Sequence, residues 1–158
     1  MTTIEKKSLK AGRFVSTEHA NTVIKNYKKE RWVHNSRRIG KEDSLSVWFS
    51  IEELEEFLAK AKDHGASGVR YYFGAYEENF AERPLYAGRQ TIVMVATKQA
   101  TTSNGPKDKD IYISSKEGNE ILAYNVGAIC PPICTGNDGF GEIGITIVDK
   151  GEEGLIVA

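Results

Sequence analysis

The chain has 158 residues, with 21 basic and 22 acidic side chains, so its formal net charge is -1. This balance argues against a nucleic-acid protein built on excess positive charge, and a hydrophobic content of 40% argues against global disorder. The charge is unevenly placed, because residues 1–41 sum to +8 and residues 42–158 sum to −9. We therefore predict a single domain, 1–158, in which a basic N-terminal helical segment (1–41) accompanies an acidic body (42–158).

Several classes of protein are not indicated. No apolar run approaches the roughly 20 residues that cross a bilayer, and the first residues lack the apolar stretch of a secretory signal. Two cysteines do not make a disulfide framework. The common phosphate-loop, zinc-protease, hydrolase and calcium-loop motifs are missing. We expect a soluble cytoplasmic protein with no membrane contact, no metal and no cofactor.

The first predicted element is a helix from Ser16 or Thr17 to about Val33. A hydroxyl residue suits its N-cap, and basic residues crowd its last turns, where the helix dipole favours cations. Apolar residues at helical spacing predict a buried stripe, formed by Ala20, Val23, Ile24 and Tyr27. The polar stretch 35–44, which contains Gly40, is predicted to be a loop.

A short strand at 46–49 leads into the clearest helix of the chain. Ser50 and Glu53 have the spacing of a capping box, and Gly65 is placed to end the helix in a left-handed conformation. The apolar residues repeat at helical spacing and predict one buried face, formed by Ile51, Leu54, Phe57, Leu58 and Ala61.

Strands account for most of the remaining chain. Residues 69–76 are rich in aromatic and β-branched side chains, and 91–96 form an apolar run typical of a central strand. Residues 101–110 are predicted to be a polar loop, and 121–125 a strand or a short helix. Further strands are predicted at 111–113, at the alternating Ile143, Ile145 and Ile147, and at 155–157. The expected fold class is α+β, with about two main helices on one face of a mixed sheet of about five strands.

The central part of the chain resembles a group of small uncharacterised bacterial proteins. The resemblance rests on Trp48-Phe49-Ser50 at the start of a helix and on the strand Gly68-Val69-Arg70-Tyr71-Tyr72-Phe73-Gly74. The later Cys130-Pro131-Pro132-x-Cys134 segment is similar to a loop in some of them. The similarity covers residues 44–97 best. It implies a shared fold and no activity.

The first candidate site is an ordered turn, because two prolines remove the backbone donors that a strand needs. It comprises Cys130, Pro131, Pro132, Cys134, Asn137 and Asp138. The simplest interpretation is that two small apolar cysteines pin the turn to the core. A thiol redox pair, a catalytic thiolate and a zinc site completed by distant histidines (His19, His34, His64) remain alternatives.

The second candidate is the polar face of the strand at 69–76, formed by Arg70, Tyr72 and Tyr76. A guanidinium beside two phenols can bind a carboxylate, a phosphate or a sugar. The alternative is structural, with both tyrosines packed beneath the helix that starts after Ser50 and Arg70 paired with a nearby glutamate.

The third candidate is a basic segment interleaved with aromatic residues. It comprises Lys25, Lys28, Lys29, Arg31, Trp32, Arg37 and Arg38, with Tyr27 among them. Such a segment can contact a polyanion or an acidic protein, but no nucleic-acid-binding motif accompanies it. Two other interpretations assign the segment no external ligand. Its lysines are simply solvated, or the segment docks on the acidic body or on a second copy of the protein.

The leading hypothesis is a small, non-enzymatic binding or interaction domain whose partner the sequence does not identify. One alternative is a small enzyme or thiol redox protein that uses the loop between Cys130 and Cys134. The other is weak nucleic-acid binding through the basic segment, which the overall charge makes the less favoured choice.

Overall fold

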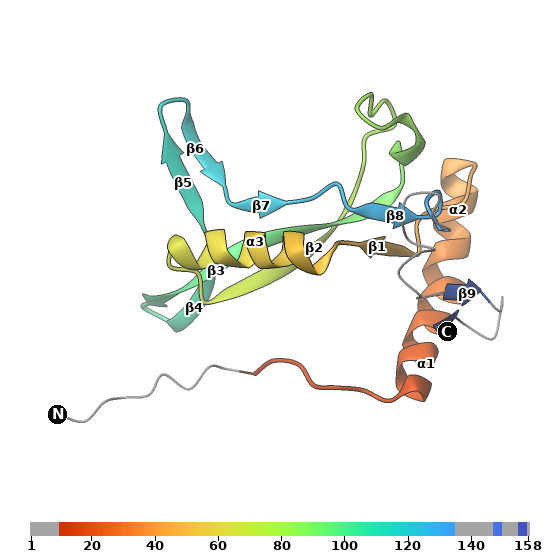
Figure 1. Cartoon of the computed structure of the whole chain (residues 1–158), viewed down its shortest axis with the longest axis horizontal. Helices are drawn as coiled ribbons and strands as arrows, with labels where there is room; N and C mark the ends of the chain where they lie inside the picture. The colour runs from red at the N-terminus through yellow and green to blue at the C-terminus, as the bar shows by residue number, and fades with distance from the viewer. Residues whose placement is uncertain (1–9, 135–146, 150–154, 158) are drawn as a thin grey trace.

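The computed structural model describes residues 10–134, 147–149 and 155–157 (Figure 1). Its helices are α1 (Thr17–Tyr27), the π-helix η1 (Lys28–Trp32), α2 (Val33–Ile39), α3 (Ile51–Asp63) and the 3₁₀ turn η2 (Pro84–Tyr86). Its strands are β1 (Ser46–Trp48), β2 (Gly68–Ala75), β3 (Gln90–Thr102), β4 (Gly105–Asp110), β5 (Tyr112–Ser115), β6 (Gly118–Ile121), β7 (Ala123–Tyr124), β8 (Ala128–Cys130), β9 (Ile147–Asp149) and β10 (Leu155–Val157). The predicted α+β class and single domain are confirmed.

The helices α1, η1 and α2 form one continuous helical run from residue 17 to residue 39. The Ser16 side chain caps its start, accepting a hydrogen bond of 3.1 Å from the backbone N–H of His19. Gly40, at φ 73°, ends it in the left-handed region that glycine adopts readily. The helix was predicted to end near Val33, and residues 35–44 were predicted to be a loop. Both predictions were wrong over residues 33–39. Asparagine and serine there weaken helix propensity, but tertiary contacts described below hold the last turns.

The predicted buried stripe of α1 was also wrong. None of the α1 residues is buried, and Val23 is 49% exposed. Ala20, Ile24 and Tyr27 are half-buried. Figure 1 shows the reason: this helix crosses the end of the main sheet and does not lie along its face. The body therefore covers only part of its apolar side.

The helix α3 follows its sequence prediction closely. Glu53 N–H donates to Ser50 Oγ at 3.1 Å, and Ser50 N–H donates to Glu53 Oε2 at 2.7 Å, which completes the capping box. Desolvation raises the pKa of Glu53, but hydrogen bonds from Ser50 and from the Tyr124 hydroxyl outweigh it and leave the pKa below its usual value. Gly65 adopts φ 82° just beyond the helix.

The main sheet has four antiparallel strands, with β3 at its centre. β2 pairs with one edge of β3, while β4 and the short β7 pair with the other. The central position of 91–96 was predicted correctly. The loop predicted at 101–110 was wrong over β4, which forms a hairpin with β3 through Thr102 and Gly105. Polar side chains do not prevent this pairing, because the hairpin is held by backbone hydrogen bonds.

The other strands form three small antiparallel pairs: β1 with β8, β5 with β6, and β9 with β10. All pairings among the described strands are antiparallel, so the strands do not share one mixed sheet and β1–α3–β2 is not a parallel crossover. Residues 121–125 take the predicted strand alternative, in β6 and β7. The strand at 155–157 is confirmed as β10; Ile147 starts β9, and Ile143 and Ile145 lie outside the described residues.

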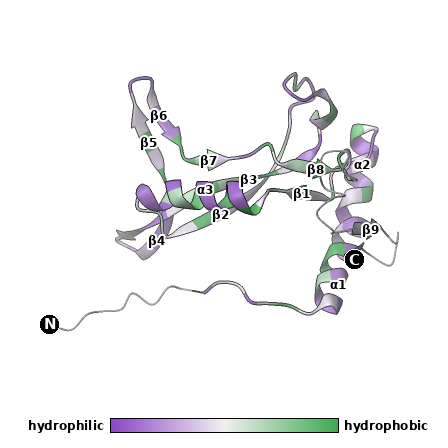
Figure 2. Cartoon of the chain, in the orientation of Figure 1, coloured by the Kyte–Doolittle hydropathy of each residue, from purple (hydrophilic) through white to green (hydrophobic). Residues whose placement is uncertain are grey.

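Two hydrophobic clusters hold these layers together. The first lies between α3 and the main sheet and contains Phe57, Ala61, Met94, Ala96 and Leu122. The second lies near the β1–β8 pair and contains Tyr76, Tyr86 and Ile129. Figure 2 shows hydrophilic and hydrophobic residues mixed along α3, as expected for a helix with one buried face. Among the described residues, no helix is long and apolar enough to span a membrane.

Gly127 precedes β8 and is buried where β1 approaches closely. A Cβ atom there would lie 2.6 Å from Val47 Cγ1 and 2.7 Å from Phe49 Cζ. We expect Gly127→Ala to lower the free energy of unfolding by about 1–3 kcal/mol, because overpacking forces neighbouring groups apart. Urea denaturation measures the change. Gly12→Ala is the matched control, since nothing lies within 4 Å of its Cβ position; equal losses in both variants would contradict the prediction.

Candidate functional site

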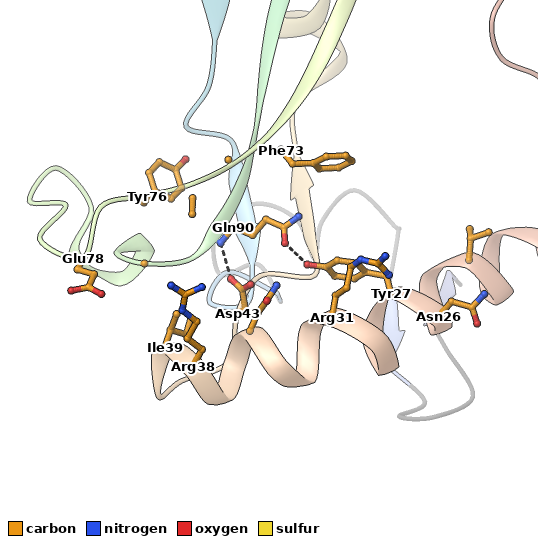
Figure 3. A pocket seen from close by; sticks show the side chains of 15 residues that line it. Asn26, Tyr27, Arg31, Arg38, Ile39, Asp43, Phe73, Tyr76, Glu78 and Gln90 are labelled. Atoms are coloured by element: carbon orange, nitrogen blue, oxygen red, sulfur yellow. Dashed lines mark hydrogen bonds between the residues drawn. The ribbon is translucent and has the colours of Figure 1, made fainter.

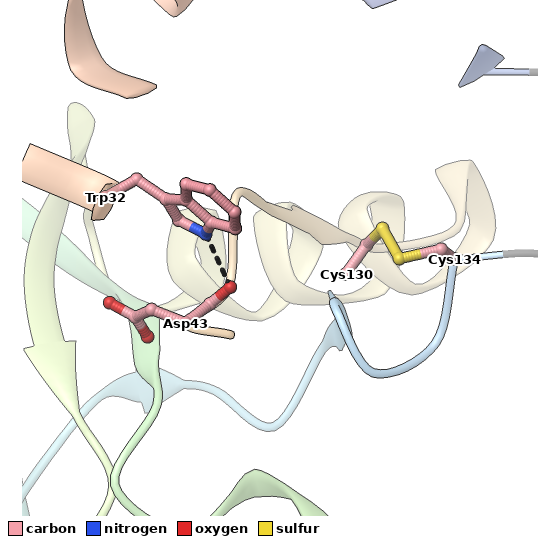
Figure 4. The surroundings of a disulfide bond; sticks show 4 residues. All are labelled: Trp32, Asp43, Cys130 and Cys134. Carbon is pink, nitrogen blue, oxygen red and sulfur yellow. Dashed lines mark hydrogen bonds between the residues drawn. A yellow bond between two sulfur atoms is a disulfide. The ribbon is translucent and has the colours of Figure 1, made fainter. Parts of the chain in front are cut away.

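Asp43 joins the N-terminal helix to the start of β3. Trp32 Nε1–H donates to the Asp43 carbonyl oxygen at 2.7 Å (Figure 4), and Asp43 N–H donates to Ser36 Oγ at 2.9 Å. The Asp43 carboxylate faces the sheet, where Oδ1 accepts from Gln90 N–H at 2.7 Å and from Ser44 N–H at 2.8 Å. The side chain is 3% exposed, so these bonds replace the water that a buried carboxylate loses.

Gln90 receives two more hydrogen bonds at this junction. The Tyr27 hydroxyl donates to Gln90 Oε1, and the Ser44 hydroxyl donates to the Gln90 carbonyl oxygen. Burial, and then the negative charge of Asp43, raise the pKa of Tyr27. The phenol therefore stays protonated and remains a donor. Helix and sheet are thus held by a connected set of hydrogen bonds.

A groove of about 980 Å³ lies beside this junction, between the N-terminal helix and the end of β2 (Figure 3). The helix contributes Val23, Asn26, Tyr27, Arg31, Asn35, Arg38 and Ile39. The opposite side contributes Phe73, Gly74, Ala75, Tyr76, Glu78, Gly88 and Gln90, with Asp43 at the junction. Aromatic, cationic and amide groups therefore meet in one concave surface.

Two guanidinium groups enter the groove from the helix. Figure 3 shows Arg31 and Arg38 extending from the helix toward the sheet, and both residues are exposed. Neither has a hydrogen-bond or ion-pair partner among the described residues. The groove also contains two carboxylates, and that of Asp43 is already bonded to backbone N–H groups. Arg31 and Arg38 are therefore available to an anionic ligand.

Phe73 supplies the apolar part of the groove. Its side chain projects from the same face of β2 as Val69, which packs against the cluster beneath α3. That cluster does not include Phe73, which is 81% exposed. An aromatic side chain this exposed at the edge of a concave surface is typical of a binding site.

The residues of the predicted polar face do not form one site, since Arg70 and Tyr72 lie together and Tyr76 lies elsewhere. Arg70 Nη1 donates to Asp110 Oδ1 at 2.8 Å, and the Tyr72 hydroxyl donates to Asp110 Oδ2 at 2.6 Å. Arg70 Nη2 also donates to the Asp108 carbonyl oxygen at 3.0 Å. The expected ion pair of Arg70 is present, but its partner is an aspartate and not a glutamate. The Arg70 guanidinium is therefore already paired with a carboxylate of the protein.

Tyr76 lies in the second hydrophobic cluster. Its hydroxyl accepts a hydrogen bond of 3.1 Å from Thr91, and its ring stacks on Phe80 with centroids 4.7 Å apart. Burial is the largest cause of the raised pKa of Tyr76. The predicted packing beneath α3 was wrong for both tyrosines: Tyr76 packs against Phe80 and Tyr86, and Tyr72 is 41% exposed.

The basic segment contributes to the groove through two of its members, Arg31 and Arg38. The Trp32 indole donates to the body, and Lys28 Nζ lies 5.7 Å from the centre of its ring. Lys25 is half-buried, while Lys29 and Arg37 are exposed outside the groove. Trp32 and Tyr27 are half-buried and hydrogen-bonded within the protein, and nucleic-acid binding through this segment stays a prediction.

The two cysteines of the predicted loop form a disulfide, with Cα atoms 4.7 Å apart (Figure 4). The bond closes the turn after β8, in which Pro131 and Pro132 follow cis peptide bonds. Both cysteines of the chain are in this disulfide, so neither is a free thiolate or a metal ligand in the oxidised protein. No group of three or more metal-ligating side chains occurs among the described residues. Asn137 and Asp138 lie outside them.

Sequence reasoning did not predict the groove itself. Val23 and Tyr27 were assigned to a buried stripe, and Phe73 was given no functional role. The sequence held one signal, since Tyr27, Arg31, Asn35 and Arg38 recur at intervals of three and four residues and so share one helix face. What lies opposite that face depends on the tertiary fold.

Comparison with known proteins adds no assignment. A scan of protein-family models, a search of curated proteins and a search of solved structures each found no match to this chain. The chain is an α+β protein with an open groove between a long helix and the end of an antiparallel sheet. That geometry is the basis for proposing a function.

Asp43→Ala should weaken the junction that forms one wall of the groove. The change leaves the Ser44 and Gln90 N–H groups without their acceptor, so we expect a loss of about 1–3 kcal/mol in the free energy of unfolding. The Ser44 and Gln90 amides should also exchange with solvent faster, as measured by NMR. Asp63→Ala, at an exposed position, should change neither quantity. Unchanged amide exchange in Asp43→Ala would contradict the role of this carboxylate.

Proposed function

We propose that this protein is a non-catalytic binding domain whose ligand site is the groove between the N-terminal helix and the end of β2. The observation that supports the proposal is the groove's size combined with its lining. At about 980 Å³, it lies in the range of sites that hold small organic ligands. Its lining combines an exposed aromatic ring with two guanidinium groups that lack a described partner.

The lining indicates the chemistry of the ligand. Phe73 and Val23 offer apolar contact, which favours a flat or apolar ligand body. Arg31 and Arg38 favour an anionic group, because guanidinium binds carboxylate and phosphate through paired hydrogen bonds. The two arginines are seven positions apart, about 10 Å along a helix. An elongated organic anion can therefore contact Phe73 and one or both arginines together.

A binding role also agrees with how the groove's other polar groups are used. The Asp43 carboxylate accepts two backbone hydrogen bonds, and the Tyr27 hydroxyl donates to Gln90. These groups hold the wall of the groove in place and so act as structural elements. The groups left for a ligand are cationic, aromatic and amide, together with the Glu78 carboxylate.

An anionic aromatic dye, 1-anilinonaphthalene-8-sulfonate, tests the proposal, because it combines an apolar body with a sulfonate. We expect its fluorescence to rise on binding the folded protein. Phe73→Ala and Arg38→Gln should each weaken binding about tenfold, the equivalent of about 1.4 kcal/mol, which is within the range of one lost aromatic or charged contact. Fluorescence titration measures the dissociation constants.

Two variants outside the groove are the matched controls. Leu85→Ala removes an apolar side chain that is 70% exposed, and Arg37→Gln removes a neighbouring exposed guanidinium. Neither residue lines the groove. Equal weakening by Arg37→Gln and Arg38→Gln would show that the dye responds only to the helix's overall charge and would refute a specific site.

The disulfide favours a second candidate function, thiol–disulfide exchange. In such a reaction a dithiol substrate would be oxidised to a disulfide, while Cys130 and Cys134 would take up two electrons and two protons. Cys134 is the exposed partner and is therefore the sulfur open to attack. A cytoplasmic location remains a prediction from the sequence alone.

The reduction of insulin by dithiothreitol tests this second candidate. If the pair exchanges catalytically, the wild-type protein should accelerate insulin precipitation over dithiothreitol alone. Cys134→Ser should abolish the acceleration, because a single thiol cannot complete the two-electron cycle. A wild-type rate equal to that of dithiothreitol alone would assign the disulfide a purely structural role.

A further inference from the structure

The strand β2 is at the edge of the main sheet, and one side of its backbone has no partner. Tyr76 N–H donates to the Arg89 carbonyl oxygen at 3.0 Å, and these residues continue the β2–β3 register. In an antiparallel pair, alternate residues bond to the neighbouring strand. The backbone N–H and C=O groups of the even-numbered β2 residues therefore bond to β3, whereas those of the odd-numbered residues point away from β3. The outward residues are Val69, Tyr71, Phe73 and Ala75.

Apart from the charge of Arg70, this edge lacks the features that usually prevent strand pairing. Residues 69–75 contain no proline and no lysine, and their register with β3 is continuous. The outward backbone groups have no hydrogen-bond partner within the described part of the chain. Exposed aromatic rings also gather here, since Tyr71 is 57%, Tyr72 41% and Phe73 81% exposed. Such an edge is a template for another strand.

We propose that the occupant is a second copy of β2, paired antiparallel about a two-fold axis at Tyr72. In this register Tyr71 lies opposite the partner subunit's Phe73, and Val69 lies opposite the partner subunit's Ala75. The four outward residues of each strand then exchange hydrogen bonds in pairs, about eight bonds in all. The two main sheets become one continuous antiparallel sheet.

Charge and side-chain chemistry favour a second copy over a foreign strand. Arg70 is the charged residue of β2, and in this register it lies opposite the partner subunit's Gly74. The two Arg70 positions are then four residues apart along the strand, about 13 Å, so like charges do not face each other. Asp110 also neutralises Arg70 at 2.8 Å. The exposed rings of Tyr71 and Phe73 meet across the axis, which covers part of each ring.

The dimer does not depend on a ligand in the groove. Its hydrogen bonds come from the β2 backbone, whereas the proposed ligand contacts are side chains, including Arg31 and Arg38 of the helix. Phe73, Gly74 and Ala75 are common to both surfaces, so the dimer places the partner subunit's Val69 and Tyr71 beside one end of the groove. Loss of dye binding in Arg38→Gln and loss of the dimer in a β2 variant are therefore separate results.

Cysteine cross-linking tests the register. Residue 72 faces its own copy at a non-hydrogen-bonded position, where Cα atoms are about 4.5 Å apart, within the range of a disulfide. With diamide as the oxidant, which takes up the two electrons and two protons, Tyr72→Cys should form a covalent dimer on a non-reducing gel. In Arg70→Cys the two introduced cysteines lie about 13 Å apart, so this variant should run as a monomer on the same gel. Equal cross-linking of both variants, or of neither, overturns the proposal.

The oligomeric state provides a second, independent test. Sedimentation equilibrium of the wild-type protein should give twice the monomer mass of 17.5 kDa. Tyr71→Pro should give the monomer mass with an unchanged far-UV circular dichroism spectrum, because its outward N–H is not used within the sheet. The dimer is refuted if the wild-type protein is a monomer at all concentrations. The same conclusion holds if that monomer binds an added β-strand peptide. A dimer that survives Tyr71→Pro also refutes pairing through β2.

Discussion

The buried carboxylate of Asp43 is the constraint on which the rest of the structure depends. It stands between the N-terminal helix and the first residue of β3, with one oxygen bonded to the N–H groups of Ser44 and Gln90. Its backbone is fixed from the other side by Trp32 and Ser36. A carboxylate this deeply buried is tolerated only when hydrogen bonds replace its water. That requirement sets the helix across the end of the sheet.

The open surfaces follow from this arrangement. Because the helix crosses the sheet end, it does not cover the sheet face on which α3 packs near Met94 and Ala96, and Phe73 is left 81% exposed. The groove forms there, with cationic side chains from one wall and an aromatic ring from the other. The described contacts that attach the basic helix to the acidic body are mainly hydrogen bonds from Tyr27 and Trp32. Arg31 and Arg38 thus remain available, although the body is strongly acidic.

Local patterns predicted the parts of the fold that local interactions hold. The capping box of Ser50 and Glu53 placed α3 correctly, because both partners are within one turn. Polar segments were misjudged when distant contacts decided their structure. Residues 33–39 are helical since Ser36 and Trp32 bond to Asp43, and β4 is a strand because it pairs with β3. Of the candidate sites, Arg31 and Arg38 were predicted as part of a possible polyanion contact, but their place in a groove was not predicted.

The sequence by itself determined the α+β class, the two main helical regions, the alternating faces of β2 and the separation of positive and negative charge. Each depends on periodicity or composition within a short window. Only the tertiary structure decided that Tyr27 meets Gln90, 63 residues away, that Arg70 meets Asp110, 40 residues away, and that Cys130 and Cys134 are bonded. The physical reason is that hydrogen bonds and ion pairs between distant residues depend on how helices and strands pack, which no local pattern records.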